Sequence, residues 1–280
     1  MPILIVPGRS VLDPLQLAES EFSLFETAPG SLIDRLIAKT TRPISRNVAA
    51  ESNYNRLVAD LSRSGSESRV LIVGGSVMGA GADNLLNMSR ATFIETDICW
   101  GPRTQLICDA HDAPFKSETM DAVVAQAVLE HVVDPTLCVA EIYRVLKPNG
   151  LVYAETPFLQ HVHMGPYDFT RFTHLGHRRL FRDFEELSSG ISGGPGMALA
   201  WALRGFFLSL TKRRRGRLLA AAVASWVTAW LKYLDSSLVK NAAAYDSASG
   251  FYFYGRKSQR PLADDDLVRK YQGGQLGFGK

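Results

Sequence analysis

The stretch from Val70 to Thr156 constrains the fold more than any other part of the chain. An apolar run leads into a Gly-rich turn at Gly74 and Gly75, and Asp97 closes a second apolar run. Segments that can form helices separate these runs from further β-rich runs at 105–108, 121–125 and 151–155. Strands that alternate with helices predict a parallel sheet with right-handed crossovers. The carboxyl edge of such a sheet is where open α/β folds bind their ligands.

The composition restricts the class of protein. Hydrophobic residues make up 46% and charged residues 21% of the 280 residues, as in a soluble globular protein. The net charge of +3 is small and much of it lies in the run 212–215, so overall charge gives no case for binding nucleic acid. Three cysteines without close pairing fit a reducing compartment. With no signal peptide recognised, the expected location is the cytoplasm.

The chain is expected to divide into four segments. Residues 1–67 form a helical lead-in with helices near 31–39 and 47–61, and residues 68–187 form a doubly wound, mostly parallel α/β sheet. Residues 188–259 contain a Gly/Ser-rich break, an apolar helical insertion and a late strand near 251–255, and residues 260–280 are a flexible tail. Residues 135–146 give the clearest helix.

The Gly-rich turn and Asp97 together indicate a cofactor that contains ribose. Glycine lets the backbone approach a ligand closely, and Asp97 lies 22 residues after Gly75, where a carboxylate can accept from both ribose hydroxyls. A structural turn and a solvated aspartate remain the alternative. The turn has neither the spacing that seats a pyrophosphate nor a Gly-Lys-Ser/Thr motif, so a cofactor without phosphates is favoured.

Three further motifs give the turn its context: Asp109-Ala110, Leu129-Glu130-His131 and the stretch from Leu146 to Gly150, which reads Leu-Lys-Pro-Asn-Gly. In this order they resemble the class I S-adenosylmethionine-dependent methyltransferases, in the branch with Leu-Glu-His and Leu-Lys-Pro-x-Gly. The resemblance covers roughly residues 68–187. It implies a Rossmann-like fold and S-adenosyl-L-methionine as the cofactor.

The resemblance also implies which residues hold the cofactor. Gly74 and Gly75 would face its methionine part, Asp97 its ribose and Asp109 its adenine amino group. The complete set of expected cofactor-binding residues is Gly74, Gly75, Gly79, Asp97, Asp109, Ala110 and Gln126. One position departs from the family, because Ile72 stands where an acid normally precedes the turn. The contact to the methionine ammonium is therefore in doubt.

The acceptor side is expected in residues 157–173, which are dense in His, Tyr, Phe and Arg. His161 and His163 alternate, so on an extended segment both would point the same way, and either of them or His131 is a candidate general base. A metal held by the first two with Asp168 is a weaker alternative, and no metal is expected. The expected substrate-binding residues are Tyr167, Asp168 and Arg171; the alternative is a structural loop in which Asp168 pairs with Arg171.

The apolar helices near the C-terminus leave several roles open. Trp226, Trp230 and Tyr233 fall on one face of a helix. Such a stripe packs into a core or lid, forms a homodimer through residues 197–234, or rests on an anionic membrane beside the basic run. The longest uncharged apolar run is too short to span a bilayer.

The sequence therefore predicts a cytoplasmic methyltransferase, with membrane association as an open addition. The expected acceptor is a small molecule, methylated on oxygen, such as a sugar, a glycolipid or a secondary metabolite. A nucleotide-linked oxidoreductase and a non-catalytic binding or assembly module are the alternatives.

Overall fold

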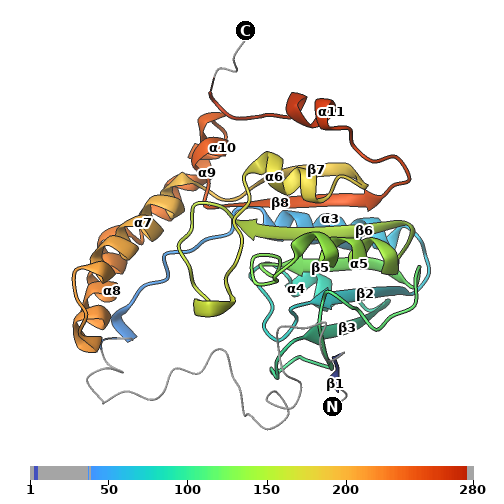
Figure 1. The fold of residues 1–280 in the computed structure, drawn as a ribbon, viewed down its shortest axis with the longest axis horizontal. Helices are drawn as coiled ribbons and strands as arrows, with labels where there is room; N and C mark the ends of the chain where they lie inside the picture. The colour runs from blue at the N-terminus through green and yellow to red at the C-terminus, as the bar shows by residue number, and fades with distance from the viewer. Residues whose placement is uncertain (1–2, 6–36, 38, 276–280) are drawn as a thin grey trace.

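A single mixed sheet organises the computed structural model, which describes residues 3–5, 37 and 39–275 (Figure 1). Within that part of the chain the sheet has eight strands in the order β1-β4-β3-β2-β5-β6-β8-β7. All neighbouring pairs are parallel except those of β8, which runs antiparallel to β6 and β7. The strands are β1 (Ile3–Leu4), β2 (Ser68–Val73), β3 (Ala91–Asp97), β4 (Leu106–Cys108), β5 (Met120–Gln126), β6 (Leu146–Pro157), β7 (Phe184–Gly193) and β8 (Gly250–Lys257).

Helices cover the sheet and extend beyond it. The described helices are α3 (Ala50–Ser62), α4 (Asp83–Leu86), α5 (Pro135–Val145), the 3-10 helix η1 (Gly165–Tyr167), α6 (His174–Leu180), α7 (Pro195–Ser209), α8 (Arg214–Thr228), α9 (Leu231–Leu238), α10 (Ala243–Ser247) and α11 (Asp264–Arg269). Among these residues no helix combines the length and the apolar character needed to cross a membrane.

The two faces of the sheet follow from the alternation of side chains along β2. Val70 and Ile72 pack with Tyr54 and Leu57 of α3 on one face. Leu71 points the other way, into a cluster that includes the α5 residues Cys138, Val139, Ile142 and Val145. Because both faces are buried, the strand reads as a continuous apolar run. The predicted doubly wound α/β fold is therefore confirmed.

Most predicted elements are present with small shifts at their ends. The helix expected at 135–146 is α5, whose N-terminus is capped by Asp134 through hydrogen bonds from the backbone amides of Thr136 and Leu137. The helix expected from residue 47 begins at residue 50, after a bend at which the Asn47 side chain accepts from the Ala50 amide. Most of the helix expected at 31–39 lies outside the described residues.

Two expectations about the C-terminal part were wrong. The Gly/Ser-rich break expected at 188–196 is mostly strand β7, where small residues let the chain pass close to β8: a side chain at Gly190 would meet the Tyr252 ring at 3.1 Å. The tail expected to be flexible contains α11, whose first turn is acidic and favours a helix N-terminus. The boundary at 187/188 therefore falls inside a strand.

Helices α7 and α8 lie side by side and extend away from the sheet (Figure 1). Asp235 joins α9 to the start of α7, because its carboxylate accepts from the amides of Gly196 and Met197, at 2.7 and 3.0 Å. Trp226, Trp230 and Tyr233 are 54%, 57% and 62% exposed. The stripe is not buried in a core, although the lead-in partly covers it: Arg42 stacks 3.7 Å from the centroid of the Trp226 ring, and the Trp226 indole donates to the Thr40 carbonyl at 2.9 Å.

Candidate functional site

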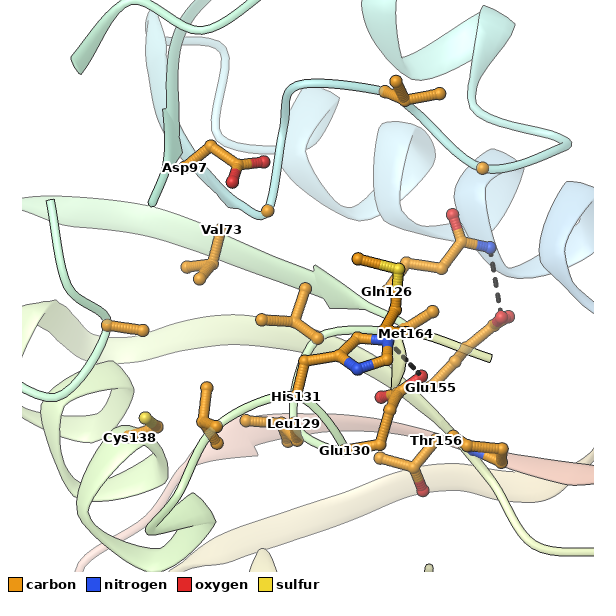
Figure 2. Close-up of a pocket in the computed structure, with 18 of the residues that line it drawn as sticks. Val73, Asp97, Gln126, Leu129, Glu130, His131, Cys138, Glu155, Thr156 and Met164 are labelled. Atoms are coloured by element: carbon orange, nitrogen blue, oxygen red, sulfur yellow. Dashed lines mark hydrogen bonds and ion pairs between the residues drawn. The ribbon is translucent and has the colours of Figure 1, made fainter. Parts of the chain in front are cut away.

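A cavity of about 600 Å³ opens at the carboxyl ends of the central strands. It lies where the strand order reverses between β2 and β5, the place where doubly wound sheets bind ligands. Figure 2 shows Asp97 on one side of it, Gln126 and Glu155 on another, and Glu130 with His131 on a third. Its size is typical of a pocket for a small organic ligand.

The turn after β2 strongly favours glycine at its first position. Gly74 has φ +69°, and a Cβ there would lie 2.5 Å from Val128 Cγ2. The backbone of the turn therefore forms part of the cavity wall. Gly79 also lines the cavity and packs against the Gln126 amide, whereas Gly75 packs against β3 and does not reach the cavity.

Asp97, the last residue of β3, has its carboxylate fixed beside this turn. The Ser76 amide donates to Oδ2 at 3.1 Å and the Cys99 amide donates to Oδ1 at 3.2 Å. A carboxylate has about four acceptor positions, so these two bonds orient the group without exhausting it. The geometry fits a group that accepts hydrogen bonds from a pair of hydroxyls.

Asp109 follows β4 and lines the cavity with Ala110. Its Oδ1 accepts from the His111 amide at 2.9 Å and from His111 Nδ1 at 2.5 Å. The hydrogen bond to Asp109 raises the pKa of His111, against the effect of burial. His111 Nε2 accepts from the Asp134 amide, so this histidine links Asp109 to the start of α5.

A buried polar cluster that the sequence did not reveal stands at the ends of β5 and β6. Glu155 accepts from Asn47 at 2.7 Å, from Gln126 at 3.0 Å and from the Tyr153 hydroxyl. The Gln126 carbonyl in turn accepts from the Tyr54 hydroxyl at 2.9 Å. Burial raises the pKa of Glu155. Gln126 thus lines the cavity with a side chain held in one orientation (Figure 2).

The residues present fit S-adenosylmethionine, with one exception. The glycine backbone at Gly74, the carboxylate of Asp97 and the remaining predicted positions at the cavity wall match what such a cofactor needs. Ile72 is the exception, because its side chain is 1% exposed in the core on the α3 side and offers no acceptor. Glu155, near the carboxyl end of β6, is a buried carboxylate that lines the cavity.

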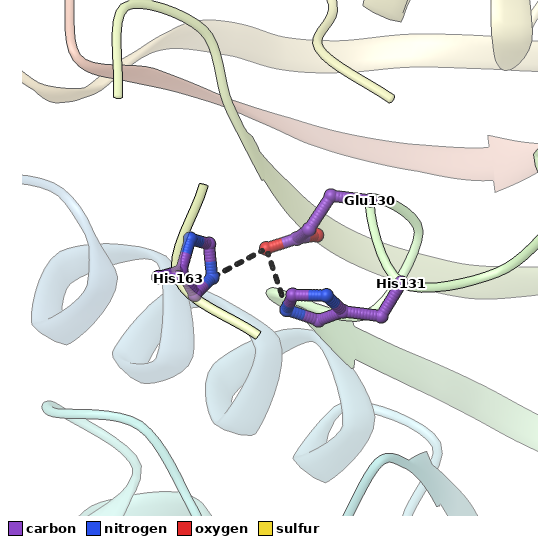
Figure 3. Close-up of side chains that lie close together, drawn as sticks. All are labelled: Glu130, His131 and His163. Atoms are coloured by element: carbon purple, nitrogen blue, oxygen red, sulfur yellow. Dashed lines mark ion pairs between the residues drawn. The ribbon is translucent and has the colours of Figure 1, made fainter. Parts of the chain in front are cut away.

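Glu130 has an unusual environment. Its residue is fully buried and neither carboxylate oxygen has a hydrogen-bond partner among the described residues. Oε1 lies 3.7 Å from Nε2 of His131 and 3.9 Å from Nε2 of His163. Burial raises the pKa of Glu130 to about 8 and lowers the pKa of both histidines. The three side chains meet at the cavity wall (Figure 3).

The backbone around Glu130 explains how residues so far apart in the chain meet. The Glu130 carbonyl accepts from the amides of Phe169 and Thr170, at 2.8 and 3.3 Å. His131 Nδ1 donates to the Tyr167 carbonyl at 2.7 Å. These bonds hold the segment after β6 over the turn that follows β5. Tyr167 and His163 therefore line the cavity.

His161 does not face the cavity, and the expectation that it points the same way as His163 was wrong. Its Nδ1 lies 3.1 Å from the Trp201 carbonyl of α7, and its ring meets the Trp201 ring edge to face. The segment 158–164 is irregular, so the alternation of an extended strand does not apply. The metal set of His161, His163 and Asp168 is accordingly not assembled.

Asp168 and Arg171 pair with each other through both carboxylate oxygens, one of them at 2.7 Å from Nη2. Arg171 also donates to the carbonyls of Gln160, His161 and Thr170. Burial, the largest single influence, raises the pKa of Asp168, but the hydrogen bonds from Arg171 and from the His163 amide, together with the charge of Arg171, lower it to about 2. Neither side chain lines the cavity, so Asp168 and Arg171 form the structural loop pair that was the alternative to substrate binding.

Comparison with known proteins identifies the central segment. Residues 82–154 match the family described as "Methyltransferase domain". The ubiquinone/menaquinone biosynthesis C-methyltransferase UbiE of Desulfotalea psychrophila is 34% identical over 85 residues, which cover 30% of this chain and 31% of that protein. The chain thus spans about a third of the length of this curated relative.

Similar solved structures are more distant. A putative sarcosine dimethylglycine methyltransferase from Galdieria sulphuraria has 13% identity and a TM-score of 0.47, over 81% of this chain and 98% of that one. The Haemonchus contortus phosphoethanolamine N-methyltransferase 2 in complex with S-adenosyl-L-methionine has 18% identity and a TM-score of 0.45, over 81% and 57%. The matched segment, residues 82–154, contributes strands β3, β4 and β5 and most of β6 to the sheet, so the part of this chain that is similar to the methyltransferase domain family lies at the cavity.

Proposed function

We propose that the protein transfers a methyl group from S-adenosylmethionine to an oxygen of a small-molecule acceptor, such as a sugar, a glycolipid or a secondary metabolite. The observation that carries the proposal is the cavity itself. One wall carries the glycine turn and Asp97, and another carries Glu130, His131 and His163. A cofactor and an acceptor therefore have separate walls of one cavity.

The reaction asks little of the protein beyond alignment. When bound, the cofactor supplies a methyl carbon on a positively charged sulfur. The acceptor oxygen forms its bond to that carbon as the carbon–sulfur bond breaks, the electron pair returns to sulfur, and the hydroxyl proton leaves the oxygen. Positioning can supply much of the rate, and help with the proton typically adds ~10²–10⁴-fold.

Oxygen is favoured because the acceptor wall is made of groups that accept protons or hydrogen bonds. His131 Nδ1 donates to the Tyr167 carbonyl, so the neutral ring presents Nε2 as an acceptor. Glu130 presents two oxygens without hydrogen-bond partners in the described part of the chain. A hydroxyl placed against these atoms would donate to them and lose its proton more readily.

Calorimetry with S-adenosylmethionine tests the cofactor half of the proposal. The wild-type protein should bind it, and NAD at the same concentration should give no heat. Asp97→Ala removes a carboxylate that would hold two hydroxyls, so affinity should fall by about 10- to 100-fold, at ~1.4 kcal/mol for each factor of ten. Asp265→Ala, in the first turn of α11, is the matched control and should bind as the wild type does. No binding by the wild type at millimolar cofactor would refute the proposal.

We further propose that α7 to α9 contact an anionic membrane surface. The exposed apolar side chains include Phe206, Leu210, Leu219, Trp226, Trp230 and Tyr233. The basic run at 212–217 lies between α7 and the first turn of α8, beside them. Apolar side chains next to lysine and arginine suit the interface of a bilayer with anionic lipids.

Cosedimentation with vesicles separates this contact from self-association. Binding to vesicles that contain phosphatidylserine, weaker binding to neutral vesicles, and loss of binding in Trp226→Ser/Trp230→Ser would support it. A stable homodimer in light scattering, with no vesicle binding, would instead assign the face to a second copy of the chain. Far-ultraviolet circular dichroism of the double variant checks that the helices persist.

A further inference from the structure

Atoms that can accept a hydrogen bond converge where Glu130, His131 and His163 meet. His131 Nδ1 carries its hydrogen toward the Tyr167 carbonyl, 2.7 Å away. His163 Nδ1 lies 3.4 Å from both Asp168 Oδ2 and the His161 carbonyl, which are also acceptors. Both Nε2 atoms therefore present lone pairs toward Glu130. Three lone-pair atoms that face one another in a buried place repel unless a cation or a proton lies between them.

The distances favour a cation over a shared proton. Glu130 Oε1 is 3.7 and 3.9 Å from the two Nε2 atoms, beyond the range of a hydrogen bond. Ligand atoms about 2.1 Å from a tetrahedral zinc ion lie roughly 3.4 Å apart, a spacing close to the one observed. All three ligand atoms lie within 4.8 Å of one another. Figure 3 shows both rings directed at the same carboxylate oxygen.

The surroundings of the three side chains are those of metal ligands. The second ring nitrogen of a metal-bound histidine usually donates to a carbonyl or a carboxylate, which fixes the ring and the tautomer. Here the Tyr167 carbonyl does this for His131, and the His161 carbonyl does it for His163, with Asp168 Oδ2 also 3.4 Å from Nδ1. The bidentate pair with Arg171 in turn holds Asp168 in place. The carboxylate of Glu130, fully buried with no hydrogen-bond partner in the described chain, points into the gap.

We propose that Glu130, His131 and His163 form a binding site for a divalent transition-metal ion of the zinc type. Two imidazoles and one carboxylate suit such an ion better than Mg²⁺ or Ca²⁺, which prefer oxygen ligands. Three protein ligands leave a fourth position open, as in catalytic zinc sites. All three side chains line the cavity, so the open position faces the space assigned to the acceptor.

This inference rests on the proposed function only for the role that a bound ion would have in the reaction. An ion at this site would bind the acceptor hydroxyl and lower its pKa, so that the hydroxyl proton can leave to water at neutral pH. The two histidines would then act as ligands, and neither would act as the base. Binding of the ion itself does not depend on methyl transfer.

Equilibrium dialysis against Zn²⁺ tests the site with tag-free protein that has been stripped with a chelator. The metal is counted by mass spectrometry, and Co²⁺ in place of Zn²⁺ should give the visible absorption bands of a tetrahedral or five-coordinate site. The wild type should retain one equivalent. Glu130→Gln and His163→Ala should each lose it or bind at least tenfold more weakly. His161→Ala is the matched control, two residues away but directed at α7, and should keep the full equivalent.

Several outcomes would overturn the proposal. They are less than a stoichiometric ion in the wild type, equal binding by Glu130→Gln and His163→Ala, or displacement of Zn²⁺ by an equal concentration of Mg²⁺. The Glu130→Gln change keeps the side-chain shape, and His163 is partly exposed, so at least one variant should fold; thermal melts establish which. Binding of S-adenosylmethionine to the same samples separates the two proposals, because zinc without cofactor binding would refute only the methyltransferase function.

Discussion

The two walls of the cavity are built in different ways. The cofactor wall consists of strand ends and the turns directly after them, so that Gly74 and Asp97 are placed by the sheet itself. The acceptor wall brings together Glu130, after β5, with His163 and Tyr167, from an irregular segment after β6. The first wall depends on backbone geometry, while the second depends on side-chain hydrogen bonds that hold a loop in place. Variants should therefore damage the two walls in different ways.

The largest effect is expected on the cofactor wall, from Gly74→Ala. The substitution puts a side chain at φ +69° and brings its Cβ to 2.5 Å from Val128, so the turn must shift. We expect about 3 kcal/mol loss in the free energy of unfolding by urea and at least ~10-fold weaker binding of S-adenosylmethionine. Gly65→Ala has a similar φ of +66° but open space around the Cβ, and should cost only about 1 kcal/mol. Equal losses in the two variants would show that the cavity wall does not depend on Gly74.

Arg171→Ala should make the acceptor wall less stable and more mobile, while the affinity for the cofactor should be retained. The change leaves the Asp168 carboxylate, 1% exposed, without its bidentate partner and frees three backbone carbonyls. About 2 kcal/mol of stability should be lost. Hydrogen exchange should quicken in residues 160–170 and stay unchanged in β2 and β3.

Arg63→Ala provides the control for this loss of a pair. Arg63 is 78% exposed in its i,i+3 pair with Asp60, so its removal should change stability by no more than about 0.5 kcal/mol. If Arg171→Ala weakened cofactor binding as strongly as Asp97→Ala, the division of the cavity into two walls would be wrong.

The difference between the walls also explains how far the sequence could be read. Strand ends and Gly-rich turns have local signatures, so the sheet, the turn and Asp97 were placed from the chain alone. Glu130 was recognised only as part of a short motif, because its burial and its two histidine neighbours depend on a fold that brings residue 163 to residue 130. Nothing in the sequence indicated that Asn47 and Glu155 interact, because the two residues are 108 positions apart in the chain.

The predicted orientation of His161 was wrong for a related reason. Alternation along an extended chain predicts that His161 and His163 point the same way. In the structure His161 contacts the Trp201 carbonyl of α7, whereas His163 lies beside Glu130 and Asp168. Long-range partners thus decided the rotamer of each ring. Helical periodicity likewise identified the apolar face of α8 and α9 but not its partners, such as Arg42 of the lead-in, which stacks on Trp226.

A smaller effect, visible as a pH dependence, is expected from His177 in the core beside the acceptor segment. Burial lowers its pKa to about 3, compared with about 6.5 in the unfolded chain. A depressed histidine pKa means that the unfolded state binds more protons, so stability is lost as the pH falls below about 6.5. Between pH 7 and pH 5 the loss should be about 1–2 kcal/mol. In His177→Leu that part of the slope should disappear from urea midpoints measured across the range, and an unchanged slope would contradict the assignment.

The smallest effect should come from His161→Ala, and it discriminates most finely between the two walls. The ring contacts the Trp201 carbonyl and lies 3.4 Å from Arg204, at the junction with α7 and away from the cavity. Loss of one partly buried hydrogen bond should cost below about 1 kcal/mol. Affinity for S-adenosylmethionine should stay within about twofold, which is about 0.4 kcal/mol. His161 does not line the cavity, so it could affect the cofactor only through the loop that it holds in place. A strong loss of cofactor affinity would therefore mean that the segment after β6 helps to shape the cofactor wall.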